Sequence, residues 1–139
     1  MVADTETTRG FAGRTAATHE SSPAVQATQI LRLAFTALPI VAGLDKFVNA
    51  LANWGEYLSR AYAALSPFSV PTTMYLVGIV EIVAGCIVAF KPRVGAWIVA
   101  GWLGLIIINL ALRGGYWDIA WRDAGLMLSA IALARLARR

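Results

Sequence analysis

The sequence has few of the residues that build most metal and redox sites. Its 139 residues include one cysteine, Cys86, and one histidine, His19. A single thiol forms neither an internal disulfide nor a metal site, so Cys86 is expected to be a small buried residue within an apolar run. His19 lies in the polar N-terminal stretch, which excludes a histidine-ligated haem or zinc site among the apolar segments. No glycine-rich phosphate loop or nucleophile elbow is present, which argues against soluble-type enzymology.

Charge is also scarce. Only 14% of residues are charged and 58% are hydrophobic, whereas soluble domains are roughly 25% charged. The mean hydropathy of +0.64 indicates that lipid is the solvent for most of the chain. The net charge of +4 is scattered over the ends of apolar runs without a basic aromatic stripe, so no nucleic-acid partner is expected.

The apolar residues fall into four segments after a polar start. Residues 1–27 lack the apolar core of a signal peptide and are expected to form a disordered cytoplasmic tail. Each apolar segment approaches the ~20 residues that cross ~30 Å of hydrocarbon as a helix. The predicted spans are about 29–51, 72–90, 94–112 and 118–137.

These spans predict an all-α, polytopic membrane protein with a four-transmembrane-helix bundle over residues 28–139. The alternative is a soluble four-helix bundle. The third span argues against it, because this span is uncharged and apolar on all faces except at Asn109, whereas a helix of a soluble bundle has a polar face. Between the first two spans, residues 52–71 could form a short interfacial helix that acts as a flap or merely as a spacer.

The basic residues predict that both termini are cytoplasmic. Eight of the 12 lysines and arginines fall on the N-terminal side of the membrane and four on the other, which favours that side as the inside. The eight are Arg9, Arg14, Arg32, Lys91, Arg93, Arg135, Arg138 and Arg139, and the four are Lys46, Arg60, Arg113 and Arg122. The expected location is the bacterial inner membrane, with several passes.

Ionisable residues inside the spans are the candidate site, because a charge in a bilayer usually faces protein or water and has a partner. Three helices each carry a polar or small seam at spacings of three and four. The seams are Arg32, Phe35, Pro39, Ala42, Lys46, Asn49 and Asn53 on the first helix, Gly78, Glu81 and Gly85 on the second, and Asp118, Arg122, Gly125, Ser129 and Ala132 on the fourth.

We expect the seams to turn inward and to form a buried cluster of Lys46, Glu81 and Arg122. Glu81 lies roughly 13 Å below the outer end of its helix at 1.5 Å per residue, within reach of the two longer side chains. Further members expected near the cluster are Asp45, Asp118, Asp123 and Asn49. Two interpretations stay open: the charges only neutralise each other and fix packing, or they line an outward-opening cavity for an anionic or hydrogen-bonding ligand.

Three stretches carry a resemblance to a known family. They are RLAFTALPIVAGLDKF in the first span, LVGIVEIVAGCIVAF in the second and WRDAGLMLSAIALARL in the fourth. The glycine shortly before Lys46 and the G-x-x-E-x-x-x-G around Glu81 are the most specific parts. Over residues 29–137 the chain resembles the DoxX-like membrane proteins, some of which look like membrane subunits of thiosulfate:quinone oxidoreductase, while others are linked to thiol and oxidative-stress systems.

The resemblance implies a membrane subunit or anchor without independent catalytic activity, and a quinone-linked redox complex is the candidate assembly. A quinone is then the candidate cofactor, and the expected partners are the lipid bilayer and either further copies of the chain or a partner subunit. The alternative is a small-solute carrier or channel that uses the charged stripe as its pathway. A third hypothesis, an enzyme acting on a lipid or quinone, would use Glu81 and Lys46 as an acid–base pair.

Overall fold

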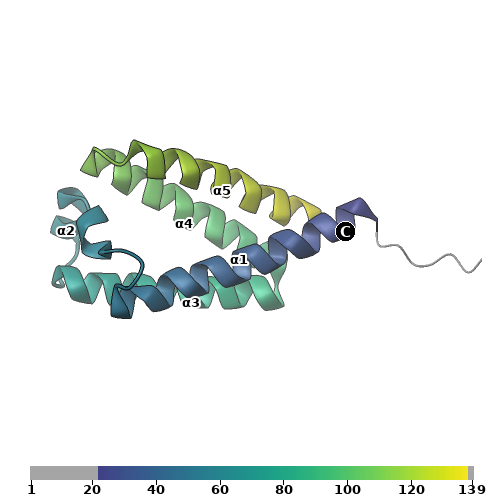
Figure 1. Ribbon diagram of the computed structural model, residues 1–139, viewed down its shortest axis with the longest axis horizontal. Coiled ribbons are helices and arrows are strands. Elements are labelled where there is room, and N and C mark those ends of the chain that lie inside the picture. Colours follow the sequence, from purple (N-terminus) through teal and green to yellow (C-terminus); the bar gives the residue numbers. More distant parts are fainter. Residues whose placement is uncertain (1–21, 138–139) are drawn as a thin grey trace, which may run out of the picture.

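The computed structural model describes residues 22–137, and within this range the chain is helical without strands, which confirms the all-α prediction. Residues 1–21, which include His19 and most of the tail expected to be disordered (1–27), lie outside the described residues. The elements are α1 (Pro23–Val48), the 3-10 helix η1 (Trp54–Tyr57), α2 (Arg60–Leu65), α3 (Val70–Phe90), α4 (Pro92–Arg113) and α5 (Trp117–Leu136) (Figure 1).

The helix α1 begins earlier and ends earlier than predicted. Its N-cap, Ser22, accepts a hydrogen bond from the backbone N–H of Val25 at 3.4 Å, and Pro23 occupies the first turn, where its missing N–H costs nothing. Residues 23–27 are therefore helical. At the other end, Asn49 adopts the left-handed conformation (φ 51°) that terminates the helix.

The long helices form two antiparallel pairs. α1 packs along α3, and α4 packs along α5, while α3 and α4 are joined by a turn at Lys91. Figure 1 shows the two pairs close together near that turn and farther apart at the opposite end, where α2 lies. Gly114 and Gly115 make the turn between α4 and α5 with positive φ angles of 72° and 84°, which glycine adopts at little cost.

The outer surface of α1, α3 and α4 is apolar, whereas the core of the bundle is built largely from small residues. Exposed large apolar side chains include Leu33 and Val48, each 71% exposed, and they continue along α3 and α4. The core residues are Phe35, Ala84, Val88, Ala96, Val99, Ala100, Ala130, Leu133 and Ala134. Such an exterior belongs in lipid rather than in water.

Three helices, α1, α3 and α4, are long and apolar enough to cross a membrane, which indicates a membrane protein. α5 is not among them because its 20 residues include Asp118, Arg122, Asp123 and Arg135. The expectation that Cys86 is buried is wrong: the thiol is exposed. Cys86 shares the outward face of α3 with Ile79, Val83 and Phe90, at helical spacing, so it points away from α1 and α4.

Candidate functional site

The site begins where two glycines let α1 and α3 approach closely. A Cβ on Gly43 would lie 2.5 Å from the carbonyl oxygen of Gly78, and a Cβ on Gly78 would lie 2.6 Å from that of Gly43. The Cβ of Lys46 packs against Gly78 of the opposite helix, and the Cβ of Glu81 packs against Gly43. The helices therefore bring the ammonium and the carboxylate face to face, with Lys46 Nζ 2.6 Å from Glu81 Oε2 and side-chain exposures of 4% and 8%.

The ammonium group of Lys46 is enclosed on its remaining sides. It lies 3.7 Å from the centre of the Trp54 ring, and it donates to the carbonyl oxygen of Ala42 at 3.4 Å. A cation over an indole face is stabilised electrostatically, most strongly when water is excluded. The buried charge of Lys46 is thus matched by a carboxylate, a carbonyl and an aromatic ring.

Asp45 is also buried, but its carboxylate accepts hydrogen bonds from the residues that follow α1. Its carboxylate accepts from the backbone N–H groups of Ala50 and Leu51, both at 3.0 Å to Oδ1, and from the indole N–H of Trp54 at 2.7 Å. The exposed Asn49 accepts from the backbone of Trp54 at 3.4 Å. These two predicted site residues therefore shape the turn that places Trp54 over Lys46.

On α5 the structure buries a different face from the one predicted. Arg122 is 67% exposed and Asp118 is exposed, so neither joins the buried cluster. Asp123 is buried instead, with Arg122 Nε 3.5 Å from its carboxylate. The prediction for Arg122 is wrong because α5 packs through the face of Ala120, Asp123, Ala130, Leu133 and Ala134.

Each long helix contributes one group to what we call the polar core: Lys46 from α1, Glu81 from α3, Trp102 from α4 and Asp123 from α5. The buried indole nitrogen of Trp102 lies near the Glu81 carboxylate, without a hydrogen bond of standard geometry between the two groups. The Asp123 carboxylate also interacts electrostatically with Glu81. The sequence pattern did not single out Trp102, because an indole in an apolar span is typical of lipid or packing contacts.

Residues 50–69, here called the cap, lie across the wide end of the bundle and contain η1 and α2 (Figure 1). Asn109 on α4 holds the cap with both ends of its amide: Oδ1 accepts from Ser59 N at 2.9 Å, and Nδ2 donates to Tyr57 O at 2.8 Å. Arg113 Nε donates to Glu56 O at 3.0 Å. The predicted short helix is therefore present, and side chains of α4 fasten it.

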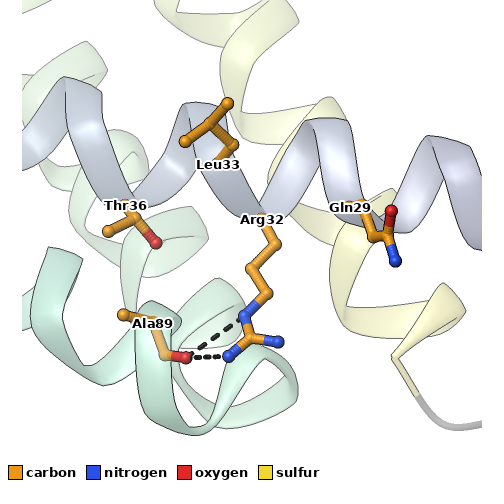
Figure 2. A pocket seen from close by; sticks show the side chains of 5 residues that line it. All are labelled: Gln29, Arg32, Leu33, Thr36 and Ala89. Atoms are coloured by element: carbon orange, nitrogen blue, oxygen red, sulfur yellow. Dashed lines mark hydrogen bonds between the residues drawn. The ribbon is translucent and has the colours of Figure 1, made fainter.

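Arg32 lies at the opposite end of the bundle and does not belong to the polar core. Its Nε donates to the carbonyl oxygen of Ala89 at 3.1 Å, and Nη2 donates to the same oxygen (Figure 2). Ala89 is in the last turn of α3, whose carbonyls lack helical partners. The shallow hollow around Arg32 is lined by Gln29, Leu33, Thr36 and Ala89.

Comparison of the chain with protein-family models, with curated proteins and with solved structures finds no match. Among residues 22–137, no group of three or more His, Cys, Asp and Glu residues is placed to hold a metal ion. The candidate site is therefore defined by this chain's own geometry: a closed polar core beneath a fastened cap.

Proposed function

We propose that the chain is a DoxX-like, four-span protein of the bacterial inner membrane, with both termini cytoplasmic. In this proposal it acts as a membrane subunit or anchor of a quinone-linked redox complex, without independent catalytic activity. The observation that carries the proposal is that the bundle is apolar outside and polar inside, the reverse of a soluble protein. Large apolar side chains cover the outer faces of α1, α3 and α4, while the polar core lies inside the bundle with one residue from each of the four long helices.

The packing of α5 supports a fourth span. α5 runs back along α4 from the turn at Gly114 and Gly115, and its 20 residues are about 30 Å long at 1.5 Å per residue. If α4 crosses the bilayer, α5 shares its environment over most of that length. Arg122 lies within about two turns of the α5 start, from where a long side chain can extend toward the interface.

The other half of the bundle favours an anchor over a carrier. Toward the turn at Lys91 the core consists of apolar residues such as Phe35, Val88 and Leu133. A solute pathway would require polar groups or water to continue through this half. The polar core stops short of it, so we do not extend the proposal to a solute carrier or channel.

A quinone head group suits the chemistry of the polar core. Its carbonyl oxygens accept hydrogen bonds, and the polar core holds two donors, the Lys46 ammonium 2.6 Å from Glu81 and the buried indole N–H of Trp102. The core is closed by the cap, whose Trp54 ring covers the Lys46 ammonium, so a head group would enter when the cap moves away from Lys46. We propose this ligand for the core and assign no redox step to the chain's own residues.

Native mass spectrometry of the tagged full chain, expressed at its natural level and extracted into nanodiscs, tests the proposal. We expect additional mass from a partner subunit, from a bound quinone, or from both. The matched control is the Lys46→Met/Glu81→Met double variant, which should retain the partner and lose the quinone. Recovery of the chain alone or only with further copies of itself, without added mass, would overturn the subunit proposal.

A further inference from the structure

The exposed face of α5 differs from the exposed faces of the other long helices. On α4, large apolar residues such as Ile98, Leu105 and Ile108 point outward, as expected for a surface in contact with lipid. The exposed large side chains of α5 are Trp117 and Trp121 near one end, and Leu128. Between and beyond them runs a stripe of charged and small residues, Asp118, Arg122, Gly125, Ser129 and Ala132, here called the α5 seam.

The seam has both space and exposed charge. A Cβ added to Gly125 would meet no atom within 4 Å. The Arg122 side chain is 67% exposed, and the ion pair found for it among the described residues is the 3.5 Å contact with Asp123. An arginine in contact with lipid is costly, and such side chains almost always face protein or water. Even with the Arg122 head group extended toward the interface, the seam presents charged and small side chains where α4 presents large apolar ones, so it is poorly suited to lipid.

We propose that the α5 seam binds the α5 seam of a second copy of this chain, forming a two-fold dimer in the membrane. The inference rests on the proposed function in one respect, namely that α5 crosses the bilayer. A second copy fits because the seam is complementary to itself. Its two charges, Asp118 and Arg122, have opposite sign and lie one helical turn apart.

In a two-fold dimer about the membrane normal, the two α5 helices are parallel and equivalent residues meet. Arg122 of each copy can then reach about one turn, roughly 5.4 Å, to Asp118 of the other. Two symmetric ion pairs result, and the planar guanidinium suits a carboxylate partner. Farther along the seam, Gly125 and Ser129 are two small residues four apart, the spacing that lets membrane helices pack closely.

Disulfide trapping tests the dimer in a Cys86→Ser background, where the exposed native thiol is removed. Gly125→Cys is compared with Gly101→Cys on α4, because at both glycines a Cβ meets nothing within 4 Å. Mild oxidation in native membranes should link Gly125→Cys chains into dimers, since parallel helices in close contact bring equivalent Cα atoms within disulfide range. Gly101→Cys chains should stay monomeric.

A second measurement is needed in case the Gly125→Cys thiols do not reach the geometry of a disulfide. Gly125→Ile should raise the dimer dissociation constant at least tenfold in detergent titrations while helix content stays unchanged, and Gly101→Ile should leave it unaltered. Equal trapping at both positions, or none at Gly125→Cys together with no effect of Gly125→Ile, would overturn the dimer.

Labelling with a membrane-impermeant maleimide distinguishes failure of the dimer from failure of the four-span proposal. If the Gly125→Cys thiol is protected from the reagent but never cross-links, and Gly125→Ile leaves the dissociation constant unchanged, the dimer is wrong and the four-span proposal is unaffected. If the thiol is labelled rapidly in intact vesicles, α5 is not in the bilayer, and the four-span proposal fails together with the dimer. Protection combined with cross-linking supports both.

Discussion

Replacing Lys46 by methionine should lower the free energy of unfolding by about 3–5 kcal/mol. The variant leaves the Glu81 carboxylate buried without the ammonium group that lies 2.6 Å away in the native chain. Removing one partner of a buried pair is costly because the remaining charge stays desolvated. Unfolding titrations in mixed micelles, followed by circular dichroism, measure the loss.

The double variant Lys46→Met/Glu81→Met should recover most of that stability. Replacing a buried ion pair by apolar residues of similar size is often neutral or stabilising, so we expect a value within about 1 kcal/mol of the native chain. The control is Arg60→Met in the exposed start of α2, which should change stability by no more than about 0.5 kcal/mol. A double variant as unstable as the single one would show that the two charges do not act as a pair.

Adding one methyl group at Gly43 should weaken the packing of α1 on α3. Alanine ordinarily stabilises a helix by about 1 kcal/mol relative to glycine. At Gly43, however, the new Cβ would lie 2.5 Å from a backbone oxygen of Gly78, so the two helices must move apart. We expect Gly43→Ala to lose about 1–3 kcal/mol, the usual cost of overpacking, in the same unfolding titration.

Gly101→Ala provides the matched control, because its Cβ meets nothing within 4 Å. This variant should be as stable as the native chain or slightly more stable. Since Lys46 and Glu81 each lie over the opposing glycine, Gly43→Ala should also lengthen the Lys46–Glu81 contact. Equal stability of Gly43→Ala and Gly101→Ala would contradict the close approach of α1 and α3.

The sequence predicted the helices well because their apolar runs are long and nearly free of charge. Predicted and observed bounds differ mainly in α1, where the N-cap at Ser22 and the left-handed Asn49 override the limits of the apolar run. The placement of Glu81 also followed from the sequence. A carboxylate in mid-helix beside Gly78 and Gly85 has one face where another helix can cover it, and all three residues are buried.

The buried face of α5 did not follow from the sequence. Spacings of three and four identify residues that share a face, but they do not say which face meets the neighbouring helix. The neighbouring residues Arg122 and Asp123 lie on different faces, and only the packing against α4 decides that Asp123 turns inward. The contacts of Asn109 with the cap depend on residues about 50 positions away, which periodicity does not detect.

The four-span arrangement is tested most directly by thiol accessibility in sealed vesicles of known orientation. In a Cys86→Ser background, Ser22→Cys, Lys91→Cys and Ala137→Cys should react with a membrane-impermeant maleimide from the cytoplasmic side. Ala61→Cys, in the cap, should react from the opposite side. Ala137→Cys decides the question, because it follows the end of α5. Labelling of Ala137→Cys from the same side as Ala61→Cys would contradict the account, since only α1, α3 and α4 would then cross the membrane.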